Sequence, residues 1–238
     1  MRPAIILIET STSLCSVALM EGDSVTAVRV GAEPRSHAAM TAPYVKEVLE
    51  ERGLKVSDCD AVCLSMGPGS YTGLRVGSST AKGLCFGGGV PLLAVGTLDV
   101  LVAQAIAEGL PEGCRYIVPM IDARRMEVYT AVYTADGQRL TEVAPVVVGG
   151  IESLGWPFND ICITDTPGNG VLFIGDGVQK CEPVLAAEGR WFRQECPRAD
   201  AMALPALREW NARAFRDTAY FEPFYLKDFI ATTPKKLF

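Results

Sequence analysis

The sequence predicts an α/β fold built from two similar domains, and three observations support this prediction. The hydrophobic fraction of 49% and the charged fraction of 21% are typical of a chain with a sizeable core. Short β-branched segments bounded by turn residues alternate with longer segments of helical periodicity. The order of these segments in the first half of the 238 residues begins again in the second half.

The first half begins with three predicted strands. Residues 4–9 are short, apolar and followed by the polar turn Thr10-Ser11-Thr12-Ser13, which is typical of a buried strand. Residues 15–20 alternate in polarity, and Glu21-Gly22-Asp23 predicts a hairpin turn into a third strand over 25–30.

Helices then alternate with strands. Ser36 predicts the N-cap of the first helix and Gly53 its end. The loop Gly67-Pro68-Gly69-Ser70 joins a strand to the second helix. The elements predicted here are a helix over 36–52, a strand over 60–66, a helix over 71–86, a strand over 91–95 and a helix over 98–108.

The second half begins in the same way. Ile8-Glu9-Thr10 and Ile121-Asp122-Ala123 occupy matching places at strand ends, which indicates an internal duplication. Much of 151–201 shows no clear pattern. The elements predicted here are strands over 115–122, 127–134, 139–148 and 171–174 and a helix over 201–215.

A three-stranded meander followed by helices that alternate with parallel strands is the ribonuclease-H-like unit. We therefore predict two ribonuclease-H-like domains in the actin-like (ASKHA) arrangement, each a mixed five-stranded sheet flanked by helices. The N-terminal domain is expected over 1–102 and the C-terminal domain over 103–238, with a last helix or tail that can pack back on the first domain. Such a fold implies no particular activity.

The composition excludes several classes of protein. His37 is the only histidine, so one chain cannot form a two-histidine metal centre or an H-E-x-x-H protease site. None of the eight cysteines forms a C-x-x-C pair, and no secretory signal pattern begins the chain, so we expect reduced thiols and a cytoplasmic protein. The net charge of −6 argues against a protein that binds nucleic acid by itself.

The helix after the glycine-rich loop has small residues on one face. The loop itself matches neither a Walker loop nor G-x-G-x-x-G, and its residues favour a tight turn with Ser70 as helix cap over an anion site. Small residues at every fourth position let another helix approach closely. A contact between chains and a contact with the helix's own sheet are equally compatible with this stripe, which consists of Gly73, Gly77, Ala81 and Cys85.

The preceding helix has two apolar faces, although a surface helix needs only one. We expect the second face to meet a partner or to be buried within its own domain. The faces are Ala38, Ala42, Val45 and Leu49, and His37, Met40, Tyr44 and Val48.

Two carboxylates end matching strands. In an actin-like fold, Glu9 and Asp122 would face the cleft between the domains, where they could organise a metal–nucleotide. Thr10 and Arg124 stand beside them as candidate anion contacts. The residues alone favour solvated strand ends.

Several motifs together resemble one family, the bacterial TsaB proteins, also called YeaZ and described as glycoprotease-like. They run from Ile6 to Lys227 in the family's order, and the block Gly67-Pro68-Gly69-Ser70-Tyr71-Thr72-Gly73-Leu74-Arg75 is the most specific of them. The supporting motifs are the segments 6–12, 81–84, 95–98, 121–129 and 222–227.

The resemblance implies a scaffold subunit without catalytic residues, metal or cofactor of its own. Its family partners are the catalytic subunit TsaD and the ATPase TsaE. Together they transfer a threonylcarbamoyl group to the adenosine beside the anticodon in tRNAs that read codons starting with A. ATP or ADP would be present only in the assembled complex, tRNA would bind only through it, and no membrane is involved.

The family self-associates, as a homodimer when alone, or binds TsaD through two helices that match 36–52 and 71–86. One departure is Glu9, since the family usually has Asp there and TsaD has Glu. However, the TsaD metal motif H-x-x-x-H is absent, because Thr41 stands four residues after His37. The interface residues expected from the resemblance and the helix faces are His37, Met40, Tyr44, Val48, Tyr71, Gly73, Arg75, Gly77 and Ala81.

A small actin-like kinase or ATPase is the alternative. It would need a phosphate-binding loop, a metal carboxylate and a base at the substrate hydroxyl. Glu9 and Asp122 could supply carboxylates, and Gly175-Asp176-Gly177 is the nearest candidate for an adenosine motif.

Overall fold

The computed structural model describes residues 3–31, 37–149, 170–186 and 188–227. The predicted N-cap Ser36 and much of the patternless segment 151–201 lie outside these residues. No helix in the described ranges is both long enough and apolar enough to cross a membrane.

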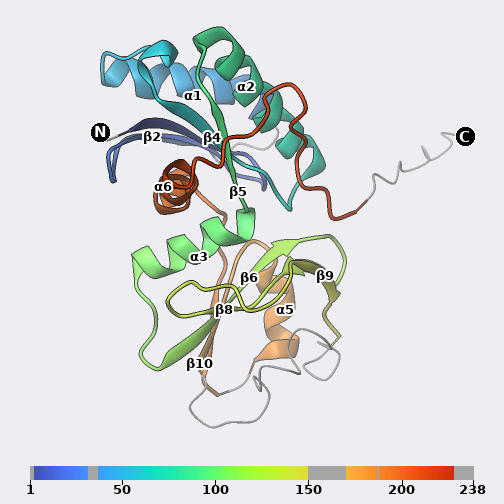
Figure 1. Cartoon of the computed structure of the whole chain (residues 1–238). Coiled ribbons are helices and arrows are strands. Elements are labelled where there is room, and N and C mark those ends of the chain that lie inside the picture. Colours follow the sequence, from blue (N-terminus) through green and yellow to red (C-terminus); the bar gives the residue numbers. More distant parts are fainter. Residues whose placement is uncertain (1–2, 32–36, 150–169, 187, 228–238) are drawn as a thin grey trace, which may run out of the picture.

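The first sheet has five strands in the order β3-β2-β1-β4-β5 (Figure 1). The hairpin strands β1, β2 and β3 are antiparallel, whereas β1, β4 and β5 run parallel. This is the predicted meander followed by crossover strands. The strands are β1 (Ala4–Glu9), β2 (Cys15–Glu21), β3 (Ser24–Gly31), β4 (Ala61–Ser65) and β5 (Leu92–Val95).

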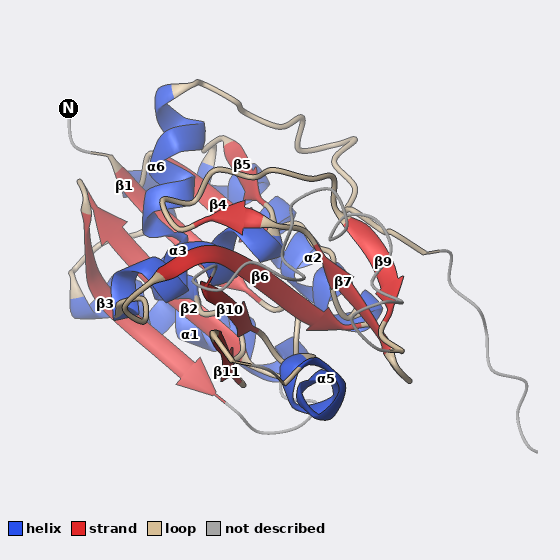
Figure 2. Ribbon diagram, turned by 90° about the horizontal axis from the view of Figure 1, so that it is seen from below, coloured by secondary structure: helices blue, strands red, loops and turns tan. Residues whose placement is uncertain are grey.

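The second sheet repeats the same topology, in the order β11-β10-β6-β7-β9. Figure 2, seen from below, shows this sheet in front of the first. The first and second halves therefore share one arrangement, as the duplication predicts. The strands are β6 (Cys114–Asp122), β7 (Glu127–Thr130), β8 (Tyr133–Thr134), β9 (Ala144–Val147), β10 (Gly170–Ile174) and β11 (Arg190–Arg193).

This sheet has six strands where five were predicted, because the strand predicted over 127–134 is divided. Strand β7 pairs with β6 at Met120, and β8 pairs with β6 at Ile117 in the same register. Between them stands Pro119, which has no N–H to donate to the ladder.

The helices form layers on both sheets (Figure 1). Helices α1 and α2 cover one face of the first sheet, and α6 lies on its other face. Helix α5 packs on the second sheet. The predicted helix over 201–215 is shorter, since it follows a 3-10 turn over Ala199–Met202. The helices are α1 (His37–Glu51), α2 (Tyr71–Gly88), α3 (Thr97–Glu108), α5 (Val178–Leu185) and α6 (Ala203–Asn211).

Helix α3 belongs to the cores of both sheets. Val100 packs with the first sheet and α6, whereas Leu101 packs with the second sheet. The division predicted between residues 102 and 103 falls within this helix and stays a prediction. Beyond α6 the chain returns to the first sheet, where the N–H of Arg216 donates to the carbonyl of Leu92 at 2.8 Å.

The small-residue face of α2 is internal. A Cβ atom at Gly73 would meet the carbonyl oxygen of Thr10, and one at Gly77 would meet its hydroxyl. The Thr10 hydroxyl donates to the carbonyl of Gly73 at 2.8 Å, and Ala81 and Cys85 continue the same face into the core. The structure thus favours a contact within the chain, the alternative that the stripe left open.

We predict that Gly73→Ala lowers the free energy of unfolding by about 1–3 kcal/mol, because the added methyl group overlaps a backbone oxygen. Gly83 is the matched control, since it lies on the same helix and a Cβ there meets nothing within 4 Å. Gly83→Ala should stabilise the chain by up to about 1 kcal/mol through helix propensity. Urea denaturation followed by circular dichroism measures the free energy of unfolding of both variants. Equal changes in the two variants would contradict the packing of Gly73 on Thr10.

Candidate functional site

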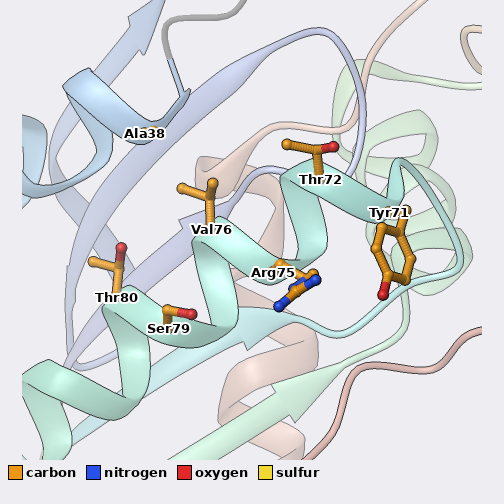
Figure 3. A pocket seen from close by; sticks show the side chains of 7 residues that line it. All are labelled: Ala38, Tyr71, Thr72, Arg75, Val76, Ser79 and Thr80. Carbon is orange, nitrogen blue, oxygen red and sulfur yellow. The ribbon is translucent and has the colours of Figure 1, made fainter. Parts of the chain in front are cut away.

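A shallow hollow runs along helix α2 and meets helix α1 at Ala38 (Figure 3). Its volume is about 460 Å³. The Arg75 guanidinium lies 5.5 Å from the centre of the Tyr71 ring, so these two side chains form one edge of the hollow. We call this hollow the α1–α2 groove, and it is lined by Ala38, Tyr71, Thr72, Arg75, Val76, Ser79 and Thr80.

The groove includes only part of the interface predicted from the sequence. Tyr71 and Arg75 are exposed and line it. Gly73, Gly77 and Ala81 are buried within the chain, so they are not available to a partner.

On α1, Val48 is fully buried in the core, which corrects its expected place at a partner surface. Tyr44 packs partly on the same core, and Met40 is half-buried. His37 places a ring nitrogen 2.9 Å from the carbonyl of Thr12. The buried side of α1 combines residues of both predicted apolar faces, Val45 and Leu49 from one and Val48 from the other. Ala38 and Ala42, which were predicted on the face of Val45, are exposed.

Most residues of the groove were not predicted from the sequence. Thr72, Val76 and Thr80 lie four residues apart, immediately beside the glycine stripe. This second stripe of small and β-branched side chains is the signal that could have identified them.

Glu9 is fully buried, which corrects the expectation of a solvated strand end. Its Oε1 atom accepts the N–H of Ser11 at 2.6 Å, whereas Oε2 has no hydrogen-bond partner. The hydroxyls of Ser11 and Thr12 are also buried without a partner. Burial raises the pKa of the Glu9 carboxyl to about 7, although the hydrogen bond from the N–H of Ser11 opposes part of this increase.

Asp122 has a different environment from Glu9, although the two end matching strands. Its side chain is exposed and pairs with Lys180, and its Oδ1 atom accepts the N–H of Arg124 at 2.7 Å. The N–H of Asp122 donates to Asp176 at 2.8 Å, and burial raises the pKa of Asp176 to about 6. The solvated strand end expected from the residues is thus found at Asp122.

The two predicted anion contacts, Thr10 and Arg124, do not form an anion site with the carboxylates. The Thr10 hydroxyl is used in the packing of α2 on its sheet, and Arg124 is exposed in the turn after β6. In the described part of the chain, no three His, Cys, Asp or Glu side chains gather to hold a metal ion.

The described cysteines are free. Burial raises the pKa of the Cys59 and Cys85 thiols to about 11, so neither forms a nucleophilic thiolate near neutral pH. Cys162 lies outside the described residues.

After α6 the chain crosses both halves of the molecule, and we call residues 216–227 the C-terminal strap. Lys82 of α2 donates to the carbonyls of Ala219 and Phe221 at 3.1 and 2.9 Å. The rings of Tyr225 and Tyr71 are 5.0 Å apart, and Lys227 forms an ion pair with Glu127 of β7. The strap therefore joins α2 to the second sheet.

Comparisons with known proteins agree on one family. The family model described as "TsaD: tRNA N6-adenosine threonylcarbamoyltransferase" matches residues 28–188. The protein TsaB of Escherichia coli K12 is 36% identical over 132 residues, which are 56% of this chain and 55% of that protein. TsaB of Bacillus subtilis is 33% identical over 142 residues, 59% of each. The chain thus spans little more than half the length of these curated relatives.

The solved structure of YeaZ from Pseudomonas aeruginosa superimposes with a TM-score of 0.78 at 26% identity, covering 94% of this chain and all of that one. These similarities define a two-domain actin-like protein. The chain belongs to the TsaD-type threonylcarbamoyltransferase family, within its TsaB/YeaZ group.

The buried Glu9 predicts a specific pH dependence of stability. Its pKa is about 7 in the folded chain and 4.5 in an ordinary environment, so the folded state holds a proton that the unfolded state releases between these values. The free energy of unfolding should therefore fall by about 3 kcal/mol as the pH rises from 4.5 to 7. Glu9→Gln should lack this decrease, since the amide stays neutral.

Urea titrations of wild type and variant at pH 5 and pH 8 measure the difference. Glu50→Gln, which removes an exposed carboxylate from α1, should keep the wild-type pH dependence. If Glu9→Gln also keeps it, the carboxyl is not desolvated as described.

Proposed function

We propose that the chain is a non-catalytic scaffold subunit of the complex that transfers a threonylcarbamoyl group to the adenosine beside the anticodon in tRNAs reading codons that start with A. One observation supports this most directly. The relatives from Escherichia coli and Bacillus subtilis are tRNA threonylcarbamoyladenosine biosynthesis proteins, and this chain has an open groove at the two helices expected from the resemblance to bind partners.

The catalytic subunit TsaD is the proposed occupant of the groove, and a second copy of the chain occupies it in a homodimer. Ala38, Thr72 and Val76 present short side chains, which allow the backbone of a partner helix to approach closely. Arg75 and Tyr71 lie at the edge of the groove, beside the proposed partner helix.

The environments of the carboxylates support a scaffold rather than a catalyst. Glu9 is enclosed and has a pKa near neutrality, and Asp122 is paired with Lys180. A kinase or ATPase needs carboxylates that are open to a metal–nucleotide. The small actin-like kinase is therefore not favoured, and we propose that ATP or ADP, TsaE and tRNA join only in the assembled, cytoplasmic complex.

The scaffold acts by differential affinity in this proposal. It binds TsaD most tightly in the arrangement that is competent for transfer, and this shifts the population of TsaD toward that state. Activity should then follow assembly.

We predict that Ala38→Arg lowers TsaD binding at least about tenfold, because a long charged side chain fills the groove and must be desolvated in the interface. Ala107→Arg on α3 is the matched control, an exposed helical alanine outside the groove. Light scattering measures assembly, and reconstitution with TsaD, TsaE, ATP, tRNA and threonylcarbamoyl adenylate measures modified adenosine. Assembly with TsaD and the amount of modified adenosine should decrease together for Ala38→Arg, and neither should decrease for Ala107→Arg. Full transfer in the absence of this chain would refute the proposed function.

We also predict that the isolated chain hydrolyses ATP no faster than a blank without protein. Hydrolysis well above the blank that is lost in Glu9→Ala or Asp122→Ala would support the kinase alternative instead. A phosphate-release assay at neutral pH with Mg²⁺ makes this comparison, and heat-denatured protein serves as the control for contaminating phosphate.

A further inference from the structure

We propose that a strip of aromatic and cationic side chains contacts RNA directly, with its cations on backbone phosphates and its rings against an unpaired base. The inference rests on the proposed function, because it assigns to this subunit a share of the tRNA surface in the assembled complex. We call these residues the aromatic–cationic strip: Arg75, Tyr71, Phe224, Tyr225, Lys227, Arg124 and Arg125.

The strip is continuous across both halves of the molecule. The Tyr71 ring is 5.5 Å from the Arg75 guanidinium and 5.0 Å from the Tyr225 ring, which is tilted by 39° against it. Two residues later, Lys227 pairs with Glu127, the first residue of β7. The turn that carries Arg124 and Arg125 immediately precedes this strand. The strip therefore runs from the α1–α2 groove to the β6–β7 turn.

The rings are held in place but remain open to solvent. Tyr71, Phe224 and Tyr225 are 36%, 41% and 38% exposed. The N–H of Phe224 donates to the carbonyl of Met66 at 2.7 Å, which fixes the backbone that carries two of the rings. Every nucleobase has a face that can stack on such a ring, so contacts of this kind tolerate many sequences.

The two arginines of the turn have an unusual conformation. Arg124 and Arg125 both have positive φ angles, 70° and 52°, where glycine or asparagine is usual. Among the described residues, neither guanidinium forms an ion pair. Strained backbone that presents unpaired arginines is typical of a binding site, and guanidinium groups suit the bidentate recognition of phosphate.

The local charge favours a polyanion. The whole chain has a net charge of −6, whereas the strip itself contains four cations and no carboxylate. Of the carboxylates beside it, Asp122 pairs with Lys180 and Glu127 pairs with Lys227. The other neighbouring carboxylates are Asp176 and Glu222. An acidic protein surface would pair with the cations but would leave the rings unused, so the alternation of rings and cations favours RNA.

The test uses the complex assembled with TsaD and an unmodified tRNA that reads a codon starting with A. Fluorescence anisotropy at several salt concentrations measures the affinity. The double variant Arg124→Gln, Arg125→Gln should weaken tRNA binding about threefold to tenfold and reduce the slope of log affinity against log salt by about one to two. Tyr225→Leu should weaken binding with an unchanged slope, because it removes a ring and no charge.

The matched control is Arg208→Gln, Arg213→Gln, which removes the same charge from helix α6 and its end, on the opposite face of the first sheet from α1 and α2. It should leave affinity and slope close to wild type. Wild-type affinity in both strip variants would overturn the inference. Strip variants that fold but no longer bind TsaD would assign the strip to a protein contact and would also overturn it. Failure of the wild-type chain to assemble with TsaD would instead refute the proposed function.

Discussion

The close contact of helix α2 with the turn after β1 is the constraint on which the groove depends. The Thr10 hydroxyl donates to the carbonyl of Gly73, and the N–H of Ser70 donates to the carbonyl of Ser11 at 2.6 Å. His37, the first residue of α1, bonds to the carbonyl of Thr12 in the same turn. Both helices are therefore anchored to one short segment, and the spacing between them follows from it.

The two halves are joined by shared packing and by the returning chain. Helix α3 supplies side chains to the cores of both sheets, and the C-terminal strap connects α2 to β7. A movement of one half against the other must break apolar contacts or the ion pair of Lys227. The groove and the aromatic–cationic strip consequently belong to one connected surface rather than to two independent ones.

The duplication preserved the topology but not the chemistry of the strand ends. Glu9 lies under the turn that anchors the helices, where burial raises its pKa, whereas Asp122 is solvated and paired with Lys180. An actin-like cleft with two open carboxylates would need the same exposure at both places. The difference follows from neighbours, since α2 covers the turn after β1 and the turn after β6 is exposed.

The sequence by itself determined the duplication, the cap of α2 at Ser70 and the order of most elements, because local periodicity and single capping residues specify these features. Helix α5 and strand β11 were not predicted, since their segment showed no clear pattern. Only the tertiary structure decided that Gly73 packs on Thr10, that Val48 belongs to the core and that Glu9 is buried. Each of these three features depends on contacts between segments that are far apart in the chain. A helix face of small or apolar residues can pack equally well on a turn of its own sheet or on a second chain, so the sequence does not distinguish the two. The aromatic–cationic strip could not be predicted from the sequence for the same reason, because Tyr71 and Tyr225 come together only in the folded chain.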